Sequence, residues 1–138
     1  MSKIVNLHDV IRGTSPPPPC DQTIDITILH AENGTAKCLW KISRSLLNGN
    51  GVVMGGFTAS AADIAMAYAL MTLLEENQTI SSINLNTTFH RPITAGEAVV
   101  HATVKKFGKK TAYVEAVVEQ LAKRAADVNS SIMILPND

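Results

Sequence analysis

Apolar residues follow one another almost without interruption from Phe57 to Leu74, directly after the glycine-rich segment NGNGVVMGG. A helix with this sequence has apolar side chains on every face, and such a helix is normally buried inside a fold. We therefore predict one long central helix from about Thr58 to Glu76. Its only charged residue before Glu75 is Asp63, whose burial would cost free energy and shift its pKa unless the carboxylate is paired or hydrogen-bonded.

Two strands are predicted before the central helix, from Thr23 to Ala31 and from Thr35 to Ile42. Isoleucines alternate with other residues in the first of them, and alternation is typical of a half-buried strand. The two segments are separated by Glu32-Asn33-Gly34, and Asn-Gly is a strong signal for a hairpin turn.

The remaining chain reads as an antiparallel series with turn residues between its members. Pro92 and Gly96 interrupt the pattern once, and Gly108-Lys109-Lys110 forms a turn. Four strands are predicted here: Ile80–His90, Glu97–Phe107, Thr111–Leu121 and Lys123–Leu135. One long helix with six strands, without an internal repeat, indicates the α+β class, with the helix packed on an antiparallel sheet of about five to six strands.

The N-terminal segment has a different pattern. Lys3–Arg12 has the apolar spacing of a short amphipathic helix, which Gly13 would end. The run Pro16–Pro19 favours an extended connector, although a proline-rich ligand for a signalling domain is the alternative interpretation. We accordingly divide the chain into an N-terminal helix and connector, residues 1–20, and one domain, residues 21–138.

Composition limits the classes of partner. Twelve basic and twelve acidic residues cancel in a chain of 138 residues, so bulk charge does not suggest binding to nucleic acid or to a membrane surface. The N-terminus lacks the apolar core of a signal peptide, and Asp63 and the small alanines argue against a membrane span at Phe57–Leu74. Cys20 and Cys38 match no metal-binding spacing and are read as reduced thiols. We expect a cytoplasmic protein.

The segments GVVMGGFTASAADIAMAYA and NLNTTFHRPITAGEAVVHATVKKFGKKTAYVEA, in this order, resemble the hotdog-fold acyl-CoA thioesterases and, among them, the phenylacetate-pathway (PaaI-like) subgroup. The resemblance covers roughly residues 43–133. The family pattern is an Asn, a Gly, a His-Gly-Gly turn and an acidic residue nine positions after the His. Five residues match this pattern: Asn48, Gly51, Gly55, Gly56 and Asp63. Met54 stands where the family has its His.

The resemblance implies a role for each matching residue. Backbone N–H groups of Gly55 and Gly56, at a helix N-terminus, would stabilise the oxyanion that forms when a thioester carbonyl is attacked. Asp63 of the neighbouring subunit would face the same carbonyl and either attack it or activate a water molecule. Asn48 would position that water or the carboxylate. Ser82 aligns with a family serine that assists the water, and Ser81 is a substitute within one residue.

The same resemblance indicates which residues contact the substrate. Met54, Gly56, Phe57 and Phe89 would lie along the acyl pocket, which suits a medium-chain or aromatic group. Basic residues would meet the phosphates of coenzyme A, and Arg91 and Lys106 are the candidates that we name, with Lys105, Lys109 and Lys110 as neighbours.

Structural interpretations exist for each of these residues. A Gly-Gly pair before a helix is commonly a tight entry, a single Asp in an apolar helix can be a structural hydrogen-bonding group, and Asn48 can be a turn residue. The lysines can be solvated turn residues. His90 and His101 have no partner at ligand spacing, so we read them as partly exposed strand residues rather than metal ligands.

We therefore expect an acyl-CoA thioesterase that needs no metal or redox cofactor and forms a homodimer or homotetramer with sites between subunits. Met54 favours one rival, a non-catalytic acyl-CoA-binding protein, because a thioether is a poor donor and does not titrate. A dehydratase of acyl thioesters is a weaker rival, since no suitable His stands beside the Gly-Gly turn.

Overall fold

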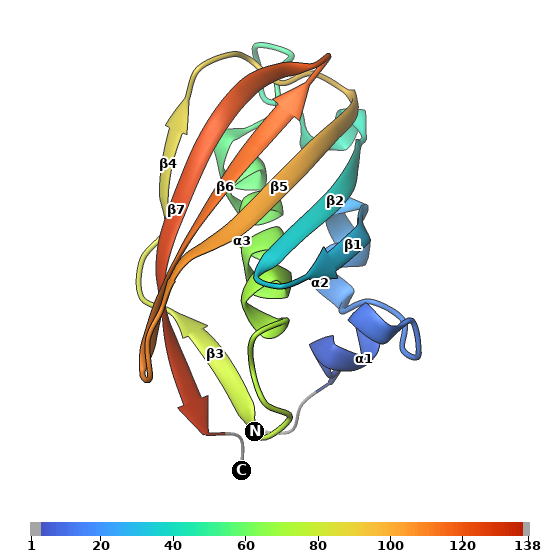
Figure 1. Cartoon of the computed structure of the whole chain (residues 1–138). Helices are drawn as coiled ribbons and strands as arrows, with labels where there is room; N and C mark the ends of the chain where they lie inside the picture. The colour runs from blue at the N-terminus through green and yellow to red at the C-terminus, as the bar shows by residue number, and fades with distance from the viewer. Residues whose placement is uncertain (1–3, 137–138) are drawn as a thin grey trace.

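One curled antiparallel sheet wraps around a single long helix, α3 (Gly55–Met71), in the computed structural model, which describes residues 4–136 (Figure 1). The sheet has seven strands: β1 (Ile26–Glu32), β2 (Thr35–Ile42), β3 (Gln78–Ser82), β4 (Asn86–Phe89), β5 (Gly96–Phe107), β6 (Thr111–Gln120) and β7 (Lys123–Pro136). Their order is β1-β2-β5-β6-β7-β3, with β4 also paired to β7. This is the predicted α+β architecture.

Helix α3 is shorter at its C-terminal end than the predicted Thr58–Glu76, because it ends at Met71. The Thr72 hydroxyl donates to the carbonyl of Ala69 at 2.7 Å and accepts the N–H of Gly34 from the β1–β2 turn at 2.7 Å. These two bonds tie the end of the helix to the hairpin. At the other end, Gly55 begins the helix three residues earlier than predicted.

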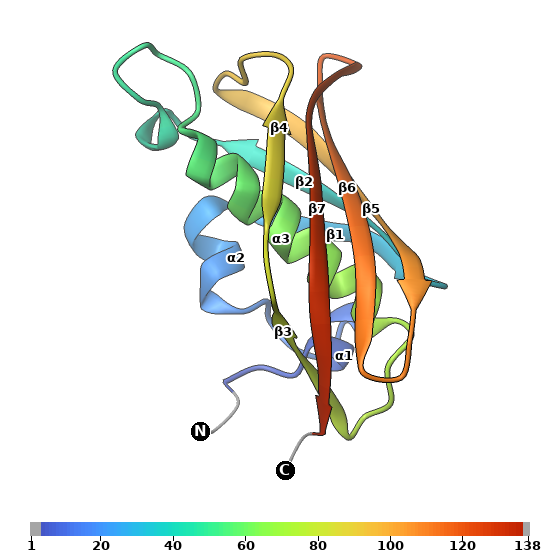
Figure 2. The same ribbon diagram turned by 90° about the vertical axis from the view of Figure 1, so that its left-hand side faces the viewer.

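The prediction for the N-terminal region is partly wrong. Helix α1 (Leu7–Arg12) is present and ends at Gly13 in the left-handed conformation, but Pro19 starts a second helix, α2 (Pro19–Ile24), where a connector and the start of a strand were expected. Proline is well suited to the first turn of a helix, where its missing N–H has no intrahelical partner. Both helices lie beside α3 (Figure 2).

The predicted strand Ile80–His90 is split into β3 and β4. Ser82 pairs with Ile132 of β7 and Asn86 pairs with Asn129. The first two residues are four positions apart and their partners only three, so this segment has one extra residue and forms a bulge. Asn84 fills the gap, because its side-chain oxygen accepts the N–H of Ser131 at 2.8 Å and its carbonyl accepts the Ser130 hydroxyl at 2.6 Å. The break therefore replaces ladder hydrogen bonds with side-chain hydrogen bonds.

The other strands agree closely with the predictions. Strand β2 has the predicted bounds, and β5, β6 and β7 each differ by one residue at one end. Asn33 and Gly34 both have positive φ, at 50° and 78°, as the two-residue turn requires. Inside the curl, Trp40 is fully buried and donates through Nε1 to the carbonyl of Ile24 at 2.9 Å, which ties β2 to the end of α2.

A buried polar contact anchors α2 to α3. Asp21 is 3% exposed and Tyr68 is 1% exposed, and the Tyr68 hydroxyl donates to Asp21 Oδ2. Cys20 Sγ donates to the other carboxylate oxygen at 3.4 Å. Burial raises the pKa of Asp21, and the hydrogen bonds from Tyr68 and Cys20 lower it in part. A raised pKa stabilises the fold at pH values below the ordinary value of the carboxyl, and this contribution is lost as pH rises through the raised pKa.

We predict that Tyr68→Phe lowers the free energy of unfolding by about 2 kcal/mol, because it removes one hydrogen-bonding partner of a buried carboxyl group. Urea denaturation of the parent and the variant measures this difference. Asp21→Asn, which keeps an acceptor for the tyrosine, serves as the matched control and should lose less stability. Equal stability of Tyr68→Phe and the parent would contradict the anchoring role of this contact.

Candidate functional site

The N-terminus of α3 presents backbone donors that no side chain caps. Met54 occupies the N-cap position with an extended backbone and makes no capping hydrogen bond. Among residues 4–136, the N–H groups of Gly55 and Gly56 have no acceptor, whereas that of Phe57 donates to the carbonyl of Met54 at 3.0 Å. Two oriented N–H groups with partial positive charge at a helix N-terminus form a site for a negatively charged oxygen.

Glycine at position 55 allows a close contact with an aromatic ring, which any larger residue would have to displace. A Cβ atom on Gly55 would lie 2.7 Å from Cζ of Phe89, which comes from the end of β4. The aromatic ring therefore packs directly on the helix start, although Phe89 is 53% exposed overall. The side chain of Met54 packs against Gly56. Its terminal methyl carbon is 3.2 Å from the position that a Cβ on Gly56 would take.

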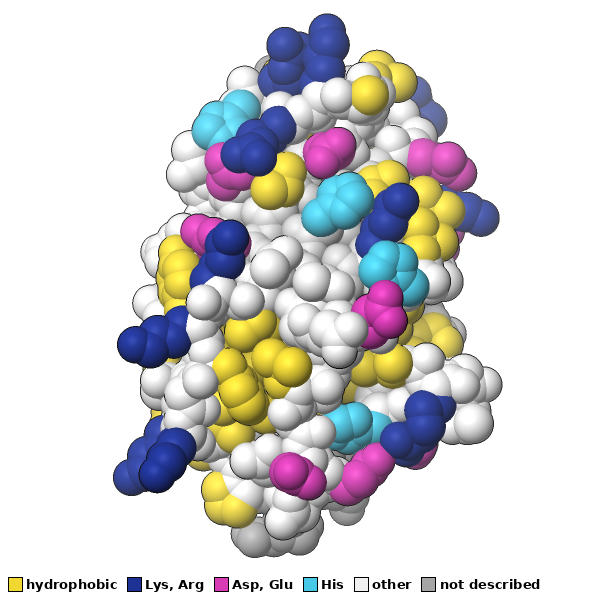
Figure 3. All heavy atoms as spheres, in the orientation of Figure 1, with side chains coloured by type: hydrophobic (Ala, Val, Ile, Leu, Met, Phe, Trp, Pro, Cys, Tyr) yellow, Lys and Arg dark blue, Asp and Glu magenta, His cyan; other side chains and the backbone are white. Residues whose placement is uncertain are grey.

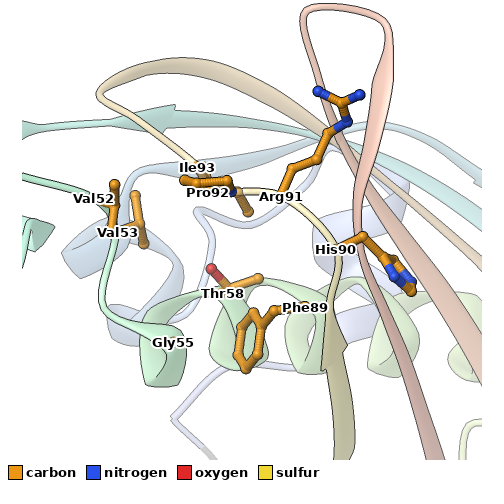
Figure 4. A pocket seen from close by; sticks show the side chains of 9 residues that line it. All are labelled: Val52, Val53, Gly55, Thr58, Phe89, His90, Arg91, Pro92 and Ile93. Carbon is orange, nitrogen blue, oxygen red and sulfur yellow. The ribbon is translucent and has the colours of Figure 1, made fainter.

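A pocket of about 420 Å³ opens beside this turn (Figure 4). Nine residues line it: Val52, Val53, Gly55, Thr58, Phe89, His90, Arg91, Pro92 and Ile93. A backbone hydrogen bond of 2.8 Å from Val53 to Ile93 joins the two chain segments above the helix. The pocket walls are mainly apolar, with the uncapped N-terminus of α3 at one side.

Asp63 and Ser82 lie together, at a distance from this turn. The Ser82 hydroxyl, at the end of β3, donates to Asp63 Oδ1 at 3.4 Å. Burial raises the pKa of Asp63, and the hydrogen bond from Ser82 lowers it in part. Among the described residues Asp63 has no cationic partner. A half-buried carboxylate with a raised pKa is suited to act as a general base.

One chain does not bring Asp63 to the N–H groups of Gly55. The two residues are eight positions apart on one helix, which corresponds to roughly 12 Å along its axis. A carbonyl group bound by the Gly55 N–H therefore lies beyond the reach of Asp63 of the same chain.

Asn48 holds the loop that leads into α3. Its side-chain oxygen accepts the N–H groups of Asn50 at 2.9 Å and Val52 at 3.4 Å, and its own N–H donates to the carbonyl of Val52 at 2.7 Å. These bonds give Asn48 a turn-forming role within the chain.

The basic candidates lie at two ends of the molecule. Arg91 lies at the rim of the pocket and points away from the helix in Figure 4. Lys106 is exposed near the end of β5, and the β5–β6 hairpin that follows it lies at the opposite end of the molecule from the start of α3 (Figure 1). Phe57 packs partly against the core in the first turn of α3.

Charges of both signs are mixed over the outer face of the sheet (Figure 3). His90 pairs with Asp127 at 2.8 Å, and Nε2 of His101 lies 3.7 Å from Glu119. Within residues 4–136, no group of three or more His, Cys, Asp or Glu side chains is arranged to hold a metal ion. In the same part of the chain, no helix has the length and apolar character needed to span a membrane.

The sheet edge beside Asp63 and the pocket is open and partly apolar. Strands β3 and β4 pair only with β7, so their other side carries free backbone groups in the described structure. Ile83, Leu85 and Phe89 along this edge are all exposed. An open edge with exposed apolar side chains is suited to contact with another chain.

The model of the thioesterase superfamily matches residues 50–125, more than half of the chain. The chain belongs to the thioesterase superfamily. The matched segment contains the Gly-Gly turn, helix α3, Asp63, Ser82 and the pocket segment around Phe89. No curated protein sequence matches the chain.

Solved structures support the hotdog fold of this thioesterase. A phenylacetic acid degradation-related protein from Ralstonia eutropha JMP134, described as a candidate thioesterase, is similar with a TM-score of 0.87 and 26% identity, over 92% of this chain and 98% of that one. The PaaI protein of the E. coli phenylacetic acid degradation operon has a TM-score of 0.84 at 22% identity, over 95% and 94% of the chains. A thioesterase from Haemophilus influenzae has a TM-score of 0.82 at 17% identity, over 97% and 93% of the chains.

Sequence reasoning did not identify several residues of the pocket. Thr58 was treated only as part of an apolar helix, although its position three residues after Gly55 places both on one face. Val53 and Ile93 come from segments forty residues apart that meet only in the fold. Alternation and spacing along the chain carry no signal for such a meeting.

We predict that Ser82→Ala raises the pKa of Asp63 further, because it removes the hydrogen bond that favours the charged carboxylate. NMR titration of the ¹³C-labelled Asp63 carboxyl group measures the midpoint. Ser81→Ala is the matched control and should leave the midpoint unchanged. A midpoint that moves equally in both variants, or in neither, would remove Ser82 from the environment of Asp63.

Proposed function

We propose that this thioesterase hydrolyses an acyl-CoA to a carboxylate and free coenzyme A. The observation that carries the proposal is the uncapped start of α3, where the N–H groups of Gly55 and Gly56 border a largely apolar pocket. A thioester carbonyl at this point gains negative charge when it is attacked, and prearranged N–H donors stabilise that charge without reorganisation.

Asp63 of the partner subunit supplies the second half of the chemistry. Its raised pKa and half-buried position suit a general base that takes a proton from water, and the same carboxylate is suited to attack the carbonyl directly. When water attacks, its oxygen bonds to the carbonyl carbon, its proton passes to Asp63, the carbon–sulfur bond breaks and the thiolate of coenzyme A leaves. When Asp63 attacks directly, the same bond breaks to give a mixed anhydride, which water then hydrolyses to release the carboxylate and restore Asp63. Ser82 orients the carboxylate through its hydrogen bond, and Asn48 holds the loop before the Gly-Gly turn.

The substrate lies along residues that flank the turn. Phe89 lines the pocket and provides apolar contact for the acyl group near the start of α3, whereas Met54, Gly56 and Phe57 lie outside the pocket lining. Arg91 at the pocket rim supplies positive charge for the phosphates of coenzyme A. Lys106 lies near the β5–β6 hairpin, at the opposite end of the same chain (Figure 1), and would meet this substrate only from a partner subunit. Coenzyme A enters as part of the substrate, and the proposed reaction uses no metal and no redox cofactor.

We propose a homodimer as the smallest active form, with a homotetramer as a pair of such dimers. The proposal that both residues act on one carbonyl, together with the roughly 12 Å between Gly55 and Asp63 on one helix, supports a carboxylate from a second chain. The open edge at β3 and β4, with exposed Ile83 and Leu85, offers the surface on which that chain can pair. A symmetric dimer then contains two equivalent sites.

Met54 favours a second candidate function, a protein that binds acyl-CoA without hydrolysing it. The thioether is 47% exposed at the N-cap of α3 and offers no hydrogen-bond donor where the family has a His. The backbone donors of the turn and the carboxylate of Asp63 do not depend on this side chain. We therefore place hydrolysis first.

We predict that Asp63→Asn lowers thiol release by about a hundredfold or more, the scale of losing a general base. The measurement is release of free coenzyme A from a panel of short, medium, long and aromatic acyl-CoAs. Asp25→Asn, at an exposed carboxylate at the end of α2, is the matched control and should keep parental activity. Near-parental turnover in Asp63→Asn would exclude Asp63 from the mechanism, and binding without thiol release by the parent would favour the non-catalytic candidate.

We further predict that two inactive variants restore activity when mixed. Gly55→Pro removes one N–H donor at the first position of the helix, where proline fits the backbone, and its Cβ also displaces the ring of Phe89. Asp63→Asn removes the base. A mixed dimer has one site with an intact Gly55 from one chain and an intact Asp63 from the other. Random pairing should return about a quarter of parental activity.

The mixing experiment separates a shared site from a site within one chain. Each variant is denatured and refolded alone as the control and should stay inactive. If the refolded mixture is no more active than the separate variants, while native mass spectrometry shows mixed dimers, the two residues do not act across the subunit boundary.

A further inference from the structure

Thr58 is a nearly buried residue at the pocket whose hydroxyl has no hydrogen-bond partner in the described part of the chain. The residue is 1% exposed, and among residues 4–136 its Oγ1 makes no hydrogen bond. Other hydroxyl residues of the same helix behave differently, since Ser60 donates to the carbonyl of Gly56 at 2.8 Å and Thr72 donates to that of Ala69. Among the described residues, Nε2 of His8 is the one fully buried side-chain polar atom without a partner, so the unpaired Thr58 oxygen keeps some accessible surface and can meet a ligand in the pocket.

The fold directs this hydroxyl toward the pocket at the helix start. Thr58 lies three residues after Gly55, and side chains at this spacing share a face and lean toward the N-terminus of the helix. Because Gly55 has no Cβ, the ring of Phe89 packs against the helix at this point, and both residues line the pocket together with Thr58. Figure 4 shows the Thr58 oxygen pointing toward Val53 and Pro92, into the pocket.

The position of Thr58 matters because the turn lacks another side-chain donor. Met54 has only a thioether, so the donors at the start of α3 are the backbone N–H groups of Gly55 and Gly56. Of the pocket residues, His90 is engaged with Asp127, and Arg91 points away from the helix in Figure 4. The Thr58 hydroxyl is the remaining side-chain donor on the Gly55 side of the pocket.

We propose that the Thr58 hydroxyl donates a hydrogen bond to the carbonyl oxygen of the bound thioester, beside the N–H of Gly55. This inference rests on the proposed thioesterase function and adds a catalytic residue to it. The hydroxyl keeps its proton throughout, and its bond strengthens as the carbonyl oxygen becomes an oxyanion and weakens when the carbon–sulfur bond breaks. Apolar walls make such a bond stronger than it would be in water.

The test compares Thr58→Val, which has nearly the same shape without the hydroxyl, with Thr58→Ser, which keeps it. For Thr58→Val we expect kcat to fall by about a hundredfold with KM changed less than threefold, since loss of one oxyanion donor acts mainly on the transition state. Thr58→Ser should stay within about fivefold of the parental kcat on the same argument. Thermal unfolding of each variant measures whether the fold is retained.

A second readout reports the contact itself. Infrared difference spectra of a ¹³C=O-labelled acyl-CoA bound to Asp63→Asn, which hydrolyses it slowly, give the carbonyl stretching frequency in the site. A hydrogen bond lowers this frequency, so adding Thr58→Val should raise it and adding Thr58→Ser should not.

The possible results are distinct. Parental kcat in a folded Thr58→Val, an equal loss in Thr58→Val and Thr58→Ser, or a carbonyl frequency unaffected by Thr58→Val would each overturn the inference while leaving the thioesterase function in place. A parent protein that releases no thiol from any acyl-CoA would overturn the proposed function and this inference with it.

Discussion

Helix α3 is buried along most of its length, and its alanine-rich faces let the sheet approach closely. A helix that is enclosed in this way satisfies its interior N–H groups itself, so only its first turn retains free donors. In this chain Met54 leaves that turn uncapped, and Gly55 admits the ring of Phe89 without a Cβ in the way. The wrapped helix thus supplies both the core of the fold and the donors of the site.

Helix α3 also fixes the distance between two groups of the candidate site. Because the uncapped start of α3 and Asp63 lie on one continuous helix, their separation along the axis is set by the helix geometry, and no side-chain rotation closes a gap of roughly 12 Å. The bulge at Asn84 ends β3 at Ser82 and begins β4 at Asn86, so one edge segment contacts both Asp63 and Gly55. In the proposed dimer, that edge is where a second chain would bring its Asp63 to the Gly55 turn.

Local patterns in the sequence were sufficient for much of the fold. The bounds of β2, the Asn33-Gly34 turn and the three long strands β5, β6 and β7 follow from alternation and turn residues. Helix α2 was missed because its stability comes from burial of Asp21 against Tyr68, forty-seven positions away. The division of the predicted Ile80–His90 strand was missed because a side chain, that of Asn84, replaces backbone hydrogen bonds there.

In the candidate site, too, some residues could be identified from nearby sequence motifs, whereas others depend on contacts between distant segments. Gly55, Gly56 and Asp63 were identified from the order of motif residues, and the hydrogen bond between Asp63 and Ser82 gives the carboxylate a defined neighbour. Thr58 had no such signal, since its burial depends on walls contributed by Val53 and Pro92. The backbone N–H groups of Gly55 and Gly56 do not depend on the side chain of Met54, so the proposed oxyanion site keeps these two donors. What Met54 removes is a side-chain donor. Thr58, three residues further along the helix, is placed to be that donor.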